Sequence, residues 1–226
     1  MEMYQGTLDQ VFLDDENPFK YRGPLPSDKG FMAQLAAGLD YIHTFGIAHR
    51  DIRPENVAIV SPNNAAGLTL VKWTGFGLSE RVNNNASYET RIPGGSVNWM
   101  APELIEKLGD FPILCTVLAD VFSAGLIFFF HLAGGVHPFG TRYQEIARNI
   151  EAGNGVNFDR KKSLLDGFFL YLLKLELSFT GLPFWQVTRS AIINVMLARN
   201  PLARSNWKNQ LNNWHTNLNE LVLFIT

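Results

Sequence analysis

A run of eight mostly polar residues, HRDIRPEN at positions 49–56, restricts the folds that this chain can adopt. Before it, apolar residues recur at spacings of three and four between Gly30 and Phe45, which predicts an amphipathic helix. After it, Val57 to Val60 is short, apolar and β-branched, as expected of a strand. The sequence therefore predicts a tight loop that carries a carboxylate, a guanidinium and an amide over an apolar helix.

The same run matches the catalytic-loop pattern of protein kinases, H-R-D-x-K-x-x-N, at every named position but one. Arg53 stands where the pattern has lysine. The chain thus resembles the C-terminal lobe of a eukaryotic protein kinase. The resemblance implies that Asp51 lies near the attacking hydroxyl, that Arg53 supplies a cation near the moving phosphoryl group, and that Asn56 is a metal ligand. His49 and Arg50 are then structural residues of the loop.

A departure from the kinase pattern follows nineteen residues after Asn56, where the sequence reads Gly75-Phe76-Gly77. The family has Asp-Phe-Gly here, and the aspartate holds the magnesium ion that bridges the nucleotide phosphates. Glycine has no side chain that could bind this ion. Because the metal neutralises and orients the phosphates, we expect the substitution to abolish or weaken catalysis.

Two later landmarks fit the same family. Ala101-Pro102-Glu103 matches the end of the kinase activation segment, and Glu103 is expected to pair with Arg204. Breaking one side of a buried ion pair costs about 3–5 kcal/mol. Asp120 opens a stretch that matches the family's buried central helix. Its carboxylate is expected to accept hydrogen bonds from the backbone of the His49–Arg50 turn, as a scaffold residue and not a catalyst.

Two apolar stretches raise the question of a membrane span. Residues 113–133 contain only Asp120 and His131 as ionisable groups. An aspartate at the centre of a bilayer costs about 2.5–3.5 kcal/mol, so a buried core helix is favoured over a span. The second stretch, residues 164–185, fits no kinase element. It is either an extra apolar insertion or a translated intron, and a small helical membrane protein remains a third hypothesis for the chain.

The other elements are expected from local patterns. Leu68 to Trp73 alternates apolar and polar residues and predicts a strand that forms a small hairpin with Val57–Val60. Residues 81–96 are rich in Asn, Ser, Thr and Gly and predict a mobile loop. Three further helices are expected, at Ala101–Leu108, Leu118–His131 and Tyr143–Glu151. A helical pattern resumes from Trp185 onwards.

The predicted loop carries three candidate phosphorylation sites, Ser87, Tyr88 and Thr90. Arg50, next to Asp51, is placed to bind a phosphate on this loop through a bidentate contact. The alternative is that these hydroxyls only solvate the loop, and the sequence favours neither.

Among kinases, the chain resembles the inositol-requiring-enzyme-type sensors of the unfolded protein response, which are kinase/endoribonucleases. Residues 2–8 (EMYQGTL) are similar to the hinge of that family, residues 94–103 to its P+1 loop, and residues 120–140 to its central helix and following turn. The resemblance implies Ser/Thr phosphotransfer from Mg-ATP, with backbone groups of Glu2 and Tyr4 against adenine. It also implies a cytosolic location, at the face of the endoplasmic reticulum membrane in a full-length sensor.

The composition sets outer limits. The formal net charge is −2, which argues against a nucleic-acid-binding segment. Hydrophobic residues make up 46% of the chain and charged residues 18%, enough apolar surface for a core. Cys115 is the sole cysteine of the sequence, so no intrachain disulfide forms, which fits a reducing compartment.

These features predict a mostly α-helical kinase-like C-terminal lobe with a small β-hairpin over residues 1–210, with the N-lobe absent because Met1 falls at the hinge. Residues 161–190 are its atypical apolar insertion, and residues 211–226 a helical tail. We expect a kinase-like domain that is inactive as this chain, with ATP and Mg binding doubtful. The alternatives are a fragment of a longer kinase and a pseudokinase scaffold that regulates a partner. A homodimer or a regulatory protein is the expected partner, and a membrane is involved only through upstream regions.

Overall fold

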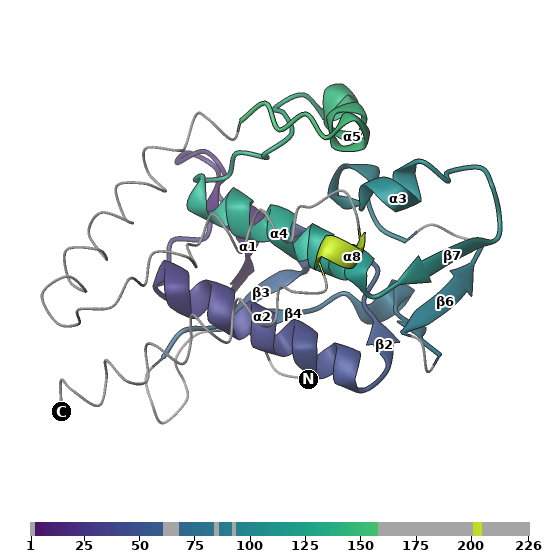
Figure 1. Cartoon of the computed structure of the whole chain (residues 1–226). Coiled ribbons are helices and arrows are strands. Elements are labelled where there is room, and N and C mark those ends of the chain that lie inside the picture. Colours follow the sequence, from purple (N-terminus) through teal and green to yellow (C-terminus); the bar gives the residue numbers. More distant parts are fainter. Residues whose placement is uncertain (1–2, 61–67, 84–85, 92–93, 158–200, 205–226) are drawn as a thin grey trace, which may run out of the picture.

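Two long helices form the centre of the molecule. The computed structural model describes residues 3–60, 68–83, 86–91, 94–157 and 201–204. Helix α2 (Asp28–Thr44) and helix α4 (Leu118–Leu132) lie side by side, with the sheet that contains β4 (Leu70–Trp73) against α2 and helix α5 (Tyr143–Ala152) beyond α4 (Figure 1). This is a helical body with small antiparallel sheets.

Helix α2 forms where the sequence predicts it and begins two residues earlier. The Ser27 hydroxyl caps it by accepting a hydrogen bond from the Gly30 amide at 3.2 Å. Gly46 follows its last turn with a φ of +65°, a conformation that glycine adopts without strain. The buried face consists of residues at helical spacing: Phe31, Met32, Leu35, Ala36 and Leu39.

Helix α4 is buried around most of its circumference, which confirms the prediction of a core helix. Phe122, Leu126 and Phe128 are at most 1% exposed. Asp120 lies in its first turn and is also buried. Among the helices of the described residues, every one is too short or too polar to cross a membrane.

The predicted hairpin is confirmed and gains a third strand. Strands β3 (Val57–Val60) and β4 (Leu70–Trp73) pair antiparallel, with Val57 opposite Trp73. The short strand β1 (Gly6–Thr7) pairs with the other edge of β3. The Trp73 indole donates a hydrogen bond of 2.8 Å to the Leu35 carbonyl and so joins the sheet to α2.

The prediction of a loop over residues 81–96 is wrong in part. Strand β5 (Glu80–Arg81) pairs with β2 (Ile47–Ala48), and β6 (Ser87–Thr90) pairs with β7 (Ile113–Thr116). The expected core helix over residues 113–133 is therefore a strand followed by a helix. The activation segment is held at two places by strand pairing (Figure 1).

The remaining elements are short and connect these parts. Helix α8 lies against α4, although the two are far apart in the sequence (Figure 1). The apolar insertion at 161–190, the tail at 211–226 and most of the helical pattern after Trp185 lie outside the described residues. The short helices and 3-10 turns are α1 (Leu8–Val11), η1 (Pro54–Asn56), η2 (Phe76–Leu78), η3 (Val97–Trp99), α3 (Pro102–Ile105) and α8 (Pro201–Arg204).

Candidate functional site

The Asp120 carboxylate anchors the start of the loop at residues 49–56. One oxygen, Oδ2, accepts the His49 backbone N–H at 2.8 Å, and Oδ1 accepts the Arg50 N–H at 2.9 Å. Oδ2 also lies 3.0 Å from Nε2 of His43, on α2. Burial acts to raise the pKa of Asp120, but these hydrogen bonds outweigh it and hold the pKa below its usual value. The predicted scaffold contact is present.

His49 and Arg50 form a tight turn at the start of the loop. Arg50 has a φ of +70°, a left-handed conformation that is uncommon for a residue with a side chain. The fully buried His49 ring lies 2.8 Å from the Thr74 carbonyl through Nε2, and its Nδ1 accepts the Asp51 N–H at 3.3 Å. Burial lowers the pKa of His49, so the ring is kept neutral. The turn thereby orients Asp51.

Asp51 and Asn56 converge, as expected of two functional groups on one loop. The Asn56 amide nitrogen donates to the Asp51 backbone carbonyl at 2.7 Å and to the Asp51 carboxylate Oδ2 at 2.7 Å. Both side chains are half-buried. The carboxylate is therefore fixed in orientation, and one of its two oxygens already has a hydrogen-bond donor.

Arg53, the expected cation of the site, has a different partner in the structure. Its guanidinium makes a bidentate contact with Glu55, with Nε 2.8 Å from Oε2 and an Nη 2.6 Å from Oε1. The hydrogen bond from Arg53 is the main reason why the pKa of Glu55 is lowered. Part of the positive charge that the sequence assigns to phosphoryl transfer is thus neutralised locally. A catalytic role of Arg53 stays a prediction.

Gly75 lies directly beside Asn56. The Thr74 amide donates a hydrogen bond of 2.9 Å to the Asn56 carbonyl, so the end of β4 and the end of η1 are in contact. Gly75 has φ +80° and ψ 38°. A Cβ atom at this residue would lie 2.6 Å from the Asn56 amide nitrogen and closer still to its oxygen. The space beside Gly75 is filled by the Asn56 side chain.

The groups present do not fit a magnesium site of the kinase kind. Protein kinase domains generally bind ATP and Mg, and they hold the metal through an aspartate and an asparagine. Here Gly75 offers no side-chain oxygen, and the Asn56 nitrogen is directed at Asp51. The described residues also hold no cluster of three or more His, Cys, Asp or Glu side chains suited to a metal ion. The Asn56 amide oxygen is thus left without a carboxylate at residue 75, although Mg²⁺ is usually bound through one or two carboxylates together with phosphate oxygens and water.

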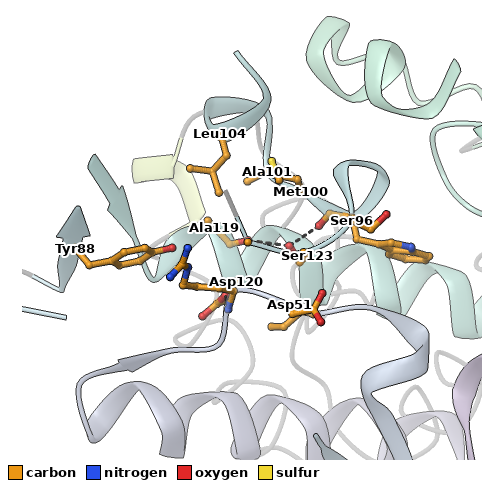
Figure 2. A pocket seen from close by; sticks show the side chains of 14 residues that line it. Asp51, Tyr88, Ser96, Met100, Ala101, Leu104, Ala119, Asp120 and Ser123 are labelled. Carbon is orange, nitrogen blue, oxygen red and sulfur yellow. Dashed lines mark hydrogen bonds between the residues drawn. The ribbon is translucent and has the colours of Figure 1, made fainter. Parts of the chain in front are cut away.

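A cleft opens on the other side of Asp51, towards the end of the activation segment (Figure 2). Two glycines allow the segment to approach the loop closely. A Cβ at Gly94 would lie 2.6 Å from the Arg50 carbonyl oxygen, and one at Gly95 would lie 3.0 Å from Asp51 Oδ1. The Ser123 hydroxyl of α4 donates to the Trp99 carbonyl at 2.6 Å and holds η3 in place. The cleft thus lies between the loop that carries Asp51 and the end of the activation segment.

The three candidate phosphorylation sites have different surroundings. The Arg50 guanidinium donates to the Thr90 hydroxyl at 2.8 Å, and it lies 5.2 Å from the centre of the Tyr88 ring. Tyr88 is only 7% exposed, and burial raises its pKa. The Ser87 hydroxyl donates to Asn83 at 2.9 Å. Thr90 is the site that contacts Arg50, whereas the Tyr88 hydroxyl lies in the interior.

Glu103 and Arg204 form the ion pair that the sequence predicts. Two guanidinium nitrogens of Arg204 lie 2.8 and 2.7 Å from the two Glu103 oxygens, a bidentate arrangement. Arg204 is completely buried, donates also to the Leu118 carbonyl, and stacks over the Phe122 ring at 4.9 Å. This contact ties the end of the activation segment to α4.

The residues proposed to contact adenine are less constrained. Glu2 lies outside the described residues, and the Tyr4 side chain is 51% exposed. Gln5 donates a backbone hydrogen bond of 2.9 Å to the Ile59 carbonyl, which places this segment along β3. The nucleotide contacts of Glu2 and Tyr4 stay predictions.

Three residues of the site were not expected from the sequence. His43 contacts Asp120, Glu55 binds Arg53, and Ser123 holds the backbone of η3. A signal exists for His43, because it lies in the last turn of α2, shortly before the loop. The pairing of Glu55 depends on rotamers, which no sequence pattern reveals.

These features, a loop anchored by a buried aspartate and an activation segment closed by a Glu–Arg pair, define a protein kinase fold. The sequence profile of the protein kinase domain matches residues 1–215, and the chain belongs to this family.

Its relatives include serine/threonine-protein kinase/endoribonucleases and a sensor for unfolded proteins. The chain is 40% identical over 129 residues to the human serine/threonine-protein kinase/endoribonuclease IRE2, which covers 55% of this chain. It is 34% identical over 125 residues to IRE1b of Arabidopsis thaliana, and 31% identical over 140 residues to the sensor for unfolded proteins in the ER ire1 of Schizosaccharomyces pombe, each covering 54% of this chain. The chain matches 13% of the length of each of these three proteins.

Proposed function

We propose that this chain is a protein-kinase-like domain of the unfolded-protein-response sensor type that does not carry out magnesium-dependent phosphoryl transfer. Its described residues correspond to the helical C-terminal lobe. The family activity is Ser/Thr phosphotransfer from ATP, and the chain keeps the carboxylate and the scaffold that this activity uses. It lacks the carboxylate that would hold the metal on the phosphate side.

The main support for the proposal is the set of possible metal ligands around Asn56. Gly75 supplies no ligand, and the Asn56 amide nitrogen is bound to Asp51. The cation of the loop, Arg53, is bound to Glu55. Phosphoryl transfer depends almost entirely on positioning and charge stabilisation, so the loss of the metal ligand is not made good by the remaining groups.

The second candidate function is a pseudokinase module that binds and regulates a partner. The activation segment favours it, because strand pairing and the Arg50–Thr90 hydrogen bond hold its described residues against the rest of the lobe. A module with a held activation segment and no side-chain metal ligand at residue 75 is suited to binding rather than transfer. We propose a second copy of the chain or a regulatory protein as the partner, at the cytosolic face of the endoplasmic reticulum membrane.

Nucleotide binding by the full 226-residue chain tests the first proposal. A fluorescent ATP analogue is titrated with and without MgCl₂, and transfer from radiolabelled ATP to the chain and to a generic Ser/Thr substrate is measured in parallel. We expect no magnesium-dependent binding and no transfer. Transfer that requires magnesium and disappears in the Asp51→Asn variant would contradict the proposal.

A matched control separates a folded, inactive chain from a misfolded one. The Asp51→Asn variant keeps the size of the side chain, so its melting temperature should stay close to that of the unmodified chain. If the unmodified chain shows a cooperative thermal transition and still binds no Mg-ATP, absence of binding is a property of the site.

A further inference from the structure

The Asn56 side chain occupies the space that a side chain at residue 75 would need. A side chain at residue 75 has its first atom fixed by the backbone, and here that atom would overlap the oxygen, carbon and nitrogen of the Asn56 amide group. The neighbouring Gly77 has no atom within 4 Å of the corresponding Cβ position. The crowding is therefore specific to residue 75.

The Asn56 backbone is fixed on both sides. Its N–H donates to the Arg53 carbonyl at 2.9 Å, and its carbonyl accepts the Thr74 N–H at 2.9 Å. Only the amide group of the side chain is free to move away from residue 75. Such a movement pulls on its two hydrogen bonds of 2.7 Å to the Asp51 carbonyl and carboxylate. In this arrangement, a side chain at residue 75 and the Asn56 amide group compete for the same space.

We infer that Asn56 and Gly75 are a coupled pair, in which the Asn56 amide occupies the volume of the missing side chain and caps the Asp51 carboxylate as an internal ligand. The contact occupies one of the two Asp51 carboxylate oxygens, Oδ2. This inference concerns the packing of the loop, so it holds or fails independently of whether the chain binds nucleotide.

The inference changes what a reversion at residue 75 does. Gly75→Asp adds a carboxylate, but its Cβ displaces Asn56 and uncouples Asp51 from its donor. A residue at this place must also tolerate a φ of +80°, which costs energy for any side chain. The strain and the displacement are separable, because only the displacement depends on Asn56.

A double-mutant cycle on the full chain makes that separation. Thermal melting is recorded for the unmodified chain, Gly75→Ala, Asn56→Ala and the double variant. We expect Gly75→Ala to lower the melting temperature clearly in the unmodified chain and by much less in the Asn56→Ala background. Equal losses in the two backgrounds would overturn the inference, since backbone strain alone is the same in both.

Gly153→Ala serves as a control for the strain. Gly153 has a φ of +69°, and its Cβ position has nothing within 4 Å. Its loss in melting temperature measures the left-handed conformation without crowding. The loss in melting temperature caused by Gly75→Ala should be larger than that of Gly153→Ala when Asn56 is present. It should approach that of Gly153→Ala in the Asn56→Ala background. A loss no larger than that of Gly153→Ala with Asn56 present contradicts the coupling.

A second measurement covers the case in which Gly75→Ala fails to fold. In the unmodified chain, the side-chain NH₂ resonances of Asn56, assigned by their disappearance in Asn56→Ser, should shift on Asp51→Asn, which weakens the acceptor. They should also show slow exchange with solvent. Resonances at the positions of a free amide, unchanged by Asp51→Asn, would show that Asn56 does not cap Asp51 and would overturn the inference.

Discussion

At the scale of single residues, the buried Asp120 carboxylate holds the turn at His49 and Arg50 in place. Two backbone N–H groups and the His43 ring converge on its two oxygens. The turn that they form includes Arg50 in a left-handed conformation. Backbone strain of this kind persists only where surrounding contacts hold it.

We predict that Asp120→Ala lowers the free energy of unfolding by at least about 3 kcal/mol, because it leaves two N–H groups and a buried imidazole without their acceptor. Urea denaturation measures the change. Asp110→Ala is the matched control, since Asp110 is exposed and its loss should stay within about 0.5 kcal/mol. If the two variants unfold at the same urea concentration, Asp120 does not hold the loop.

Much of the site could be predicted from single residues. Asp51, Asn56, Asp120 and the Glu103–Arg204 pair follow from spacing within a known pattern, and the structure brings each of them to the expected neighbours. The contact between Asn56 and residue 75 could not be predicted. It depends on which rotamer the Asn56 amide adopts. The sequence does not reveal whether a neighbouring side chain occupies the space beside a glycine.

At the scale of elements, the pairing of β6 with β7 changes how the activation segment is held. Residues 87–90 lie opposite residues 113–116, with Tyr88 facing Cys115 and Glu89 facing Leu114. Tyr88 is buried by this pairing and supports the Arg50 guanidinium. Residues 87–90 are therefore held by backbone pairing as well as by the contact with Arg50.

We predict that Leu114→Pro releases the segment. Proline removes a backbone N–H and fixes φ, so it disrupts the pairing, while the Leu114 side chain itself is 59% exposed and contributes little to the core. Trypsin should then cleave after Arg81 and Arg91 several-fold faster. Leu114→Thr, which keeps a strand-forming residue, is the control. Unchanged cleavage in Leu114→Pro would show that β7 does not hold the segment.

These two strands were missed for physical reasons. Residues 81–96 are polar and rich in turn-forming residues, so no local pattern indicates a strand, and the partner is more than twenty residues away in the sequence. Residues 113–116 precede an apolar helix without a break, and a continuous apolar run has no periodicity that separates strand from helix. Helix α2 was predictable because it is long and bounded by Ser27 and Gly46, and α5 because Gly153 ends it.

At the scale of the whole molecule, buried neutral histidines make the fold sensitive to acid. His137 is 6% exposed, lies 3.0 Å from the Asn98 carbonyl through Nε2, and accepts the Phe139 N–H through Nδ1. Burial lowers its pKa to about 4. Burial also lowers the pKa of His49.

We predict that stability falls as the pH drops from about 6.5 to about 4. In this window the unfolded chain binds a proton at His137, whereas the folded chain does not, so acid favours unfolding. The His137 contribution is fully present above pH 6.5 and amounts to about 3 kcal/mol when lost. Urea denaturation across this range, compared with His137→Gln, isolates it. Parallel curves for the two proteins would contradict the assignment.

The pair between Glu103 and Arg204 has a consequence for how the molecule is made. The two residues are 101 positions apart, and the guanidinium is completely buried between α3 and α4. A growing polypeptide leaves the ribosome with Glu103 and the cleft already translated but still without their counter-ion. The activation segment can therefore be fixed to α4 by this ion pair only after Arg204 has been translated, and any product that stops short of residue 204 leaves Glu103 without its counter-ion.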